Sequence, residues 1–129
     1  MGFVLFVSLI LVGCNQEERT IEVNEMNETD ANEVKQIMEN YEEIYGGRAI
    51  IVDDQLLVAV QSKPWLDYKK TKIEKNLKKQ LEERLPDYEV TVSADFKLYW
   101  ETEKLLDETD EEKIVKKVEK LKKLKEEET

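Results

Sequence analysis

The sequence has no histidine and only one cysteine among its 129 residues. Histidine is the commonest general base in enzymes and the commonest zinc ligand, so its absence excludes a Ser-His-Asp or Cys-His site within this chain. A single cysteine excludes an internal disulfide, so an exported domain of this sequence must fold on its hydrophobic core alone. Two prolines and four glycines argue against a fibrous or a long disordered chain.

Positive charge is also scarce, since the net charge is -10. The excess acid is concentrated between residues 15 and 45, where ten acidic residues accompany two basic ones. Such a segment beside a membrane is repelled by anionic head groups and extends. The overall charge also repels the phosphates of nucleic acid, so we expect no nucleic-acid partner. The length leaves room for one compact domain after the N-terminal stretch.

The first 13 residues carry no charged side chain and form an apolar run that stops abruptly at Cys14. The run is too short to cross a hydrocarbon core of about 30 Å as a helix, but it has the length of the apolar region of a signal peptide. Leu11, Val12, Gly13 and Cys14 resemble the bacterial lipobox, in which the cysteine thiol receives a diacylglyceryl group and the leader is cleaved before it. The basic residues that normally begin a signal peptide are missing, which leaves open whether Met1 is the true start. The alternative is a buried apolar N-terminal element with an ordinary core cysteine.

We therefore predict a lipoprotein signal peptide at residues 1–13, with residues 11–13 as its cleavage motif and Cys14 as the lipidated residue. Two acyl chains on that cysteine are enough for stable anchoring. The expected location is the extracytoplasmic face of a membrane, and the expected membrane contact is the lipid on Cys14. An acidic linker is predicted over residues 14–30.

The segment after this linker has the 3.6-residue period of an amphipathic helix. We expect the helix to begin at Ala31, with Asp30 as its cap, and to end at Gly46-Gly47. Its apolar face consists of Val34, Ile37, Met38, Tyr41 and Tyr45.

Two short apolar runs follow over residues 48–52 and 55–61, and Asp53-Asp54 between them favours a hairpin turn. Their nearly continuous apolar character predicts that both faces of the sheet are at least partly covered. A lysine-rich helix over 66–85 and a third strand over 88–93 come next.

Asp95 is the predicted N-cap of a further helix. A last, highly charged helix is expected within residues 108–129, with a narrow apolar stripe suited to docking on the domain. The predicted fold class is α+β, a small three-stranded sheet packed with helices over residues 31–107. The element order α-β-β-α-β-α-α is similar to that of the BON domain.

These features together resemble the YhcN/YlaJ family of sporulation lipoproteins from endospore-forming Gram-positive bacteria. They are the lipobox at Cys14, the acidic spacer, the strand pair over 48–60, the lysine-rich helix, and the stretch over 88–95 that ends in Val-Ser-Ala-Asp. The resemblance implies a lipoprotein of the spore inner membrane or the cell membrane, with a structural or binding role in sporulation, germination or outgrowth. The resemblance offers no catalytic residue to carry over. We expect no cofactor and no metal, and the partners we consider are an envelope protein or a wall polymer.

The lysine face of the second helix is a candidate contact surface for anionic lipid or wall polymer, represented by Lys72, Lys75 and Lys79. The alternative is a solvated outer face, because acidic residues are interspersed and amphipathic helices normally have a charged outer side. Asp53 and Asp54 offer oxygen ligands for a hard cation, but no EF-hand spacing surrounds them, and we favour a turn.

Trp65, Tyr68, Tyr99 and Trp100 either line an aromatic groove or fill the core, and we favour the core because aromatic side chains contribute most to small cores. A pocket lined by Trp65 or Trp100 would favour the alternative function, a receptor-like envelope module that binds a small ligand or a cell-wall fragment. A hydrolase built on paired carboxylates is the least favoured function, because 30 acidic residues make such pairs inevitable. We therefore predict that the protein is not an enzyme.

Overall fold

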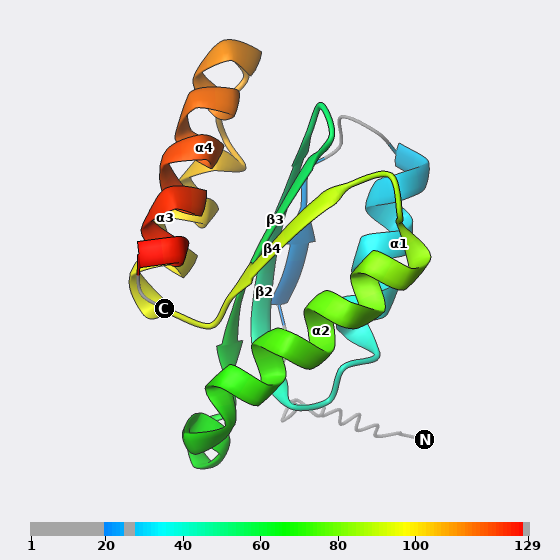
Figure 1. The fold of residues 1–129 in the computed structure, drawn as a ribbon, viewed down its shortest axis with the longest axis vertical. Coiled ribbons are helices and arrows are strands. Elements are labelled where there is room, and N and C mark those ends of the chain that lie inside the picture. Colours follow the sequence, from blue (N-terminus) through cyan, green and yellow to red (C-terminus); the bar gives the residue numbers. More distant parts are fainter. Residues whose placement is uncertain (1–19, 25–27, 128–129) are drawn as a thin grey trace, which may run out of the picture.

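The computed structural model describes residues 20–24 and 28–127. Within these residues, four strands form one mixed sheet in the order β1-β2-β3-β4, accompanied by four α-helices and one 3-10 helix. The elements in chain order (Figure 1) are β1 (Thr20–Val23), α1 (Glu28–Glu39), β2 (Ile44–Val52), β3 (Gln55–Ser62), the 3-10 helix η1 (Pro64–Lys69), α2 (Lys70–Arg84), β4 (Glu89–Ser93), α3 (Phe96–Leu105) and α4 (Glu111–Glu127).

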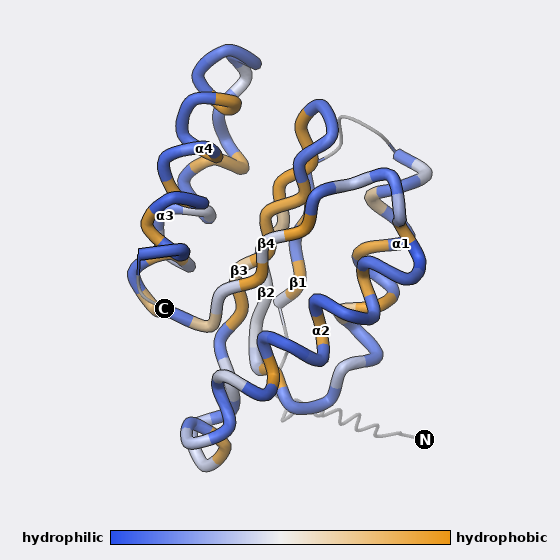
Figure 2. Tube along the Cα trace, in the orientation of Figure 1, coloured by the Kyte–Doolittle hydropathy of each residue, from blue (hydrophilic) through white to orange (hydrophobic). Residues whose placement is uncertain are grey.

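Helices cover both faces of the sheet (Figure 1). α1 connects the parallel strands β1 and β2, α2 connects the parallel strands β3 and β4, and both helices pack on one face. α3 and α4 pack on the other face. Strands covered on both sides are expected to be almost continuously apolar, and Figure 2 shows this hydrophobic centre between helices with hydrophilic outer faces. The predicted α+β class and the coverage of both sheet faces are therefore confirmed.

The sheet has four strands, however, so the prediction of three was wrong, and the BON-like order is not reproduced. The additional strand is β1, which lies within the acidic segment and pairs in parallel with β2. Ile21 is its only fully buried side chain, so the strand has too few apolar residues to show a period in the sequence. The Asn24 side chain extends the pairing, since its amide donates to the Ile51 carbonyl (3.0 Å) and its oxygen accepts from the Ile51 amide (2.7 Å).

The first helix also differs from its prediction at both ends. α1 begins at Glu28 and ends at Glu39, well before the two glycines. Asp30 lies inside its first turn and accepts a hydrogen bond from the Tyr88 hydroxyl (2.5 Å), so it binds a neighbouring segment where a cap was predicted.

Gly46 and Gly47 lie inside β2, where neighbouring side chains come too close for a Cβ atom. A Cβ at Gly46 would lie 2.8 Å from the Tyr99 hydroxyl oxygen, and one at Gly47 would overlap the Met38 methyl group. The two glycines are therefore sites of close packing on opposite faces of the sheet, and the prediction that they end a helix was wrong.

Three local predictions are confirmed. Asp53 and Asp54 form the hairpin turn, and Asp53 has a positive φ of 52°, a conformation that Asp tolerates better than most residues. The Asp95 carboxylate caps α3 by accepting from the Leu98 amide at 3.0 Å. The apolar stripe of α4 is buried against the sheet and α3 through Ile114, Val118 and Leu121.

Candidate interaction surface

The residues predicted from the lipobox, Leu11, Val12, Gly13 and Cys14, lie outside the described residues. The structure therefore describes the body that follows the predicted anchor.

The three lysines predicted as a contact surface are exposed on α2. Lys72, Lys75 and Lys79 follow one another along the outer side of the helix, whose inner side is buried against the sheet. The ion pairs within this region join other lysines to acids, Lys70 to Asp67 and Lys78 to Glu82. The structure thus brings the three together on one solvent-facing surface, and their contact role stays a prediction.

The acidic turn shows no sign of a cation site. Asp53 and Asp54 are both exposed at the tip of the hairpin. Among residues 20–24 and 28–127, no group of three or more acidic, histidine or cysteine side chains is arranged to hold a metal ion.

The exposed aromatic side chains gather at one end of the sheet. Eight of the ten aromatic residues in the sequence fall in the described part, and five of these eight have exposed fractions between 47 % and 82 %. Every exposed large hydrophobic side chain in the described part belongs to this group. We call the five together the aromatic end: Tyr45, Trp65, Tyr68, Phe96 and Trp100.

Strand register explains why residues from three separate segments meet there. Gly46, near the start of β2, pairs with Gln61, near the end of β3, and Ala59 pairs with Ser93 at the end of β4. β2 therefore begins at the end of the sheet where β3 and β4 finish. Because η1 follows β3 and α3 follows β4, both helices begin at the same end (Figure 1).

A β-bulge turns Tyr45 outward. Ile44 pairs with Ser62 and Gly46 pairs with Gln61, which leaves Tyr45 without a partner in the ladder. A bulge inserts one extra residue into a strand and redirects its side chain. The Tyr45 ring is consequently half exposed at the start of β2, although its neighbour Ile44 is fully buried.

η1 presents two rings to solvent and buries none of its own residues. Trp65 is 70 % exposed and Tyr68 is 82 % exposed. Pro64 starts the helix, where its fixed φ is favourable. The helix is held to the body through Lys69, whose ammonium lies 2.8 Å from the Glu43 carboxylate, and this hydrogen bond raises the pKa of Lys69.

Phe96 and Trp100 complete the aromatic end from α3. They are one helical turn apart and contact each other edge to face, with ring centroids 6.0 Å apart and an interplanar angle of 82°. Both rings are exposed, while Tyr99 and Leu98 on the same helix point into the protein.

A cavity of about 650 Å³ lies among these rings. Tyr45, Trp65 and Phe96 line it together with the loop between β3 and η1. Lys63, Lys70 and Asp67 also line it, and the Lys70 ammonium lies 3.4 Å from the Asp67 carboxylate, so Lys63 adds the net positive charge beside the rings. This combination of apolar rings and ammonium groups suits an amphipathic ligand or surface better than it suits a catalytic step.

The core placement favoured from the sequence is correct for Tyr99 and wrong for Trp65, Tyr68 and Trp100. The space between the sheet and the helices is filled almost entirely by aliphatic side chains, so the large rings were not needed there. Sequence reasoning also missed Tyr45 and Phe96 as surface residues. No local signal marks them, because the neighbours of Tyr45 are buried and those of Phe96 are half-buried or exposed.

Arg48 is a buried charge beside the aromatic end. It lies on β2, is 7 % exposed, and donates a hydrogen bond to the Thr20 carbonyl oxygen at 2.9 Å. Its guanidinium stacks over the Tyr99 ring, 5.0 Å from the centroid, with the Glu22 and Glu103 carboxylates 3.7 and 3.8 Å from its Nε. Burial raises the pKa of the Tyr99 hydroxyl, and the nearby arginine partly opposes this rise. Arg48 therefore fastens the first residue of β1 to the sheet.

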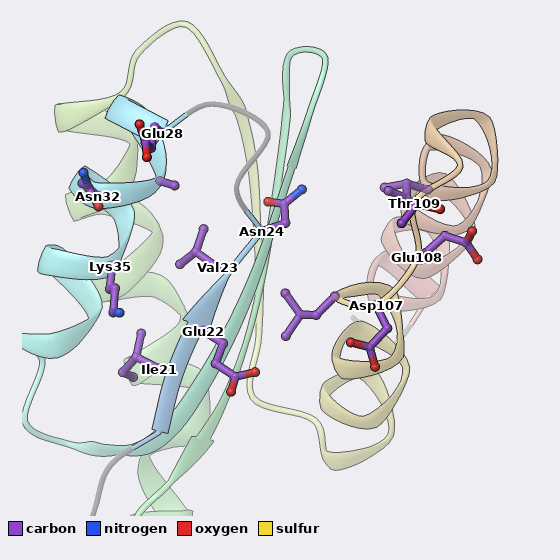
Figure 3. A pocket seen from close by; sticks show the side chains of 13 residues that line it. Ile21, Glu22, Val23, Asn24, Glu28, Asn32, Lys35, Asp107, Glu108 and Thr109 are labelled. Carbon is purple, nitrogen blue, oxygen red and sulfur yellow. The ribbon is translucent and has the colours of Figure 1, made fainter.

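A second hollow, of about 750 Å³, follows the outer edge of the sheet along β1 (Figure 3). It lies between α1 and the connection from α3 to α4. Its polar lining is mostly carboxylates and amides, among them Glu22, Asn24, Asn32 and Asp107, with Lys35 as the cation. It has no aromatic ring and is chemically distinct from the aromatic end.

The model of the family described as sporulation lipoprotein YhcN/YlaJ matches residues 11–121. The chain belongs to the YhcN/YlaJ family. The match covers most of the sequence and confirms the family predicted from the lipobox, the strands and the lysine-rich helix. Neither a curated protein nor a solved structure matches the chain.

The YhcN/YlaJ match begins at Leu11 and so includes Cys14, the sheet and the whole aromatic end in one unit. In the two described stretches of the chain, no helix has the length and apolar character required to cross a bilayer.

Proposed function

We propose that this protein is held on the extracytoplasmic face of the spore inner membrane or the cell membrane by a diacylglyceryl group on Cys14. The supporting observation is the span of the family match, residues 11–121, which joins the lipobox to the folded body. In this proposal residues 1–13 are the leader and residues 11–13 its cleavage motif. Two acyl chains are sufficient for stable anchoring.

The body has a non-catalytic structural or binding role in sporulation, germination or outgrowth. Its family is described as a lipoprotein, and the sequence has no imidazole for acid-base work. The aromatic end is the surface best suited to binding, because a cluster of exposed apolar side chains marks an interaction site. Lys72, Lys75 and Lys79 are proposed as an accessory contact for anionic lipid or wall polymer.

A second candidate function is a receptor-like module that binds a small ligand or a cell-wall fragment. The observation that favours it is the cavity lined by Trp65, Tyr45 and Phe96. Binding pockets are typically concave and lined by aromatic side chains with a few polar groups.

Intact mass spectrometry of the protein recovered from the membrane fraction of its spore-forming host tests the anchor. The expected mass is that of a chain that begins at an acylated Cys14. The matched control is Cys14→Ser, which is expected to be unacylated and either unprocessed or released from the membrane. An unmodified chain that retains Met1 and is recovered in the soluble fraction would refute the proposal.

A further inference from the structure

We propose that the aromatic end is the membrane-facing end of the body and that it docks on the phospholipid head-group interface of the anchoring bilayer. This inference rests on the proposed lipid at Cys14. It adds an orientation and a contact surface that the anchor alone does not specify.

The chain enters the folded body at the aromatic end. Thr20 is the first residue of β1 and pairs with Gly46, the residue that follows Tyr45. Six peptide units separate Cys14 from Thr20. A fully extended chain advances at most about 3.5 Å per residue, so these units span no more than about 20 Å. A lipidated Cys14 therefore keeps this end of the body close to the head groups.

The side chains at this end have the chemistry of a membrane interface. Both tryptophans of the sequence, Trp65 and Trp100, lie there and are at least half exposed. Trp and Tyr are enriched at the level of lipid head groups, because each has an apolar ring and a polar tip. Lys63 and Lys70 border the same surface, and lysine can place its stem against apolar groups while its ammonium stays among the head groups.

The opposite end of the body is acidic, which favours the same orientation. β2 runs from the aromatic end to the exposed turn at Asp53 and Asp54, and β3 runs back from it. The eight residue steps from Tyr45 to Asp53 rise about 26 Å at roughly 3.3 Å each. The connection from α3 to α4 lies at this same far end (Figure 1) and leads into Asp110, Glu111 and Glu112.

Carboxylates also lie near the aromatic end, where Glu42 is exposed, but Glu43 and Asp67 there are paired with lysines. The five carboxylates at the far end are all exposed. Anionic head groups repel carboxylates within about a Debye length, so the far end is the more disfavoured at the membrane surface.

A lipid surface accounts for more of the aromatic end than a ligand in the cavity does. Tyr45, Trp65 and Phe96 line the cavity, whereas Tyr68 and Trp100 stand outside it. A small ligand would leave those two rings in water. A bilayer interface contacts rings on an outward-facing surface whether or not they line a pocket.

The test uses the full lipidated chain on vesicles of phosphatidylcholine and phosphatidylglycerol in equal parts. Both native tryptophans report from the aromatic end, so their fluorescence needs no added label. The expected result is a blue shift of emission, quenching by phospholipids brominated near the head group, and loss of quenching by aqueous acrylamide. The matched control moves the reporter to the far end, with Trp65→Phe and Trp100→Phe combined with Asp54→Trp at the exposed turn. That reporter is expected to stay accessible to acrylamide and unquenched by the brominated lipid.

The outcomes separate docking from anchoring, because the intact mass of the same preparation is measured alongside. An acylated protein whose reporters at the two ends are equally accessible to acrylamide would overturn the docking and leave the anchor standing. A preparation without acyl groups would overturn the anchor, and docking would then lack the tether that holds the aromatic end near the head groups. If a soluble peptidoglycan fragment shifts the emission while vesicles do not, the cavity is a ligand site and the docking proposal is wrong.

Discussion

Replacing Gly46 with alanine is expected to destabilise the protein, because the new methyl group would lie 2.8 Å from the Tyr99 hydroxyl oxygen. Tyr99 cannot easily move away, since it is buried and Arg48 stacks on its ring. Overpacking of this kind typically costs about 1–3 kcal/mol, and the reduced freedom of the unfolded chain returns about 0.5–1 kcal/mol. The expected net loss is about 1–2 kcal/mol, and each kcal/mol lowers Tm by about 4–8 °C for a body of this size.

Removing one oxygen atom is expected to reverse the effect. Tyr99→Phe keeps the ring and deletes the hydroxyl, after which the nearest atoms to the new methyl group are the Gln61 Oε1 and the Thr20 carbonyl oxygen, both at 3.6 Å. These are ordinary contacts, and Gly46 has no positive φ that alanine would avoid. In the Tyr99→Phe background, Gly46→Ala should therefore be neutral or stabilising by about 0.5–1 kcal/mol.

Thermal and urea unfolding of the four proteins of this double-mutant cycle measure the coupling directly, and we expect about 1.5–3 kcal/mol between the two positions. An equal loss of stability from Gly46→Ala in both backgrounds would show that the close contact with the hydroxyl is not the reason for glycine at this position.

Two further predictions concern the attachment of single elements. Arg48→Met removes the hydrogen bond to the Thr20 carbonyl, and a hydrogen bond to a charged group contributes about 1.5–3 kcal/mol. Amide hydrogen exchange should therefore accelerate more in β1 than in β3. Unchanged exchange in β1 would contradict this prediction. Acid should weaken the attachment of α4, because the Lys117 ammonium, 2.9 Å from the Glu101 carboxylate, holds the pKa of that carboxyl below its ordinary value of 4.5. A carboxyl group with a lowered folded-state pKa stabilises the protein above pH 4.5 and loses this contribution as pH falls through the folded pKa. Tm should therefore fall more steeply in acid for the natural chain than for Lys117→Met. Parallel curves of Tm against pH for the two proteins would be evidence against a stabilising Lys117–Glu101 pair.

The elements that the sequence predicted well are those whose signal is local. Asp95 and the Asp53-Asp54 turn act through hydrogen bonding and backbone preference within a few residues, so their roles are visible without the fold. The continuous apolar runs of β2 and β3 predicted that both faces of the sheet are covered by other elements, because no other arrangement removes all those side chains from water.

The elements that it predicted poorly depend on distant partners. β1 has one fully buried side chain, Ile21, and is a strand because β2 offers it a parallel edge. Gly46 and Gly47 have the pattern of a helix end, and only their closeness to Tyr99 and Met38 shows that they are packing sites. No sequence pattern distinguishes these two roles of glycine.

The candidate surface could be predicted only in part for the same reason. The sequence placed Trp65 and Trp100 either in an exposed groove or in the core. The choice between these positions depended on whether aliphatic residues already filled the interior. Tyr45 is exposed because a bulge in β2 turns it outward, and a bulge is a property of two paired strands. The expectation that large aromatic rings lie in the core fails for this protein, because its core consists almost entirely of aliphatic side chains.

The position of β1 has a mechanical consequence. In an anchored chain, any pull between membrane and body enters at Thr20, and its component along the axis of β1 acts on the pairing with β2. The backbone bonds to β2 lie across this axis and are therefore loaded together, in shear, whereas a pull across the strand would open them one after another. The Arg48 guanidinium donates a hydrogen bond to the carbonyl oxygen of Thr20, the residue at which the load enters. A strand of only four residues is thus placed where it resists traction on the lipid tether best.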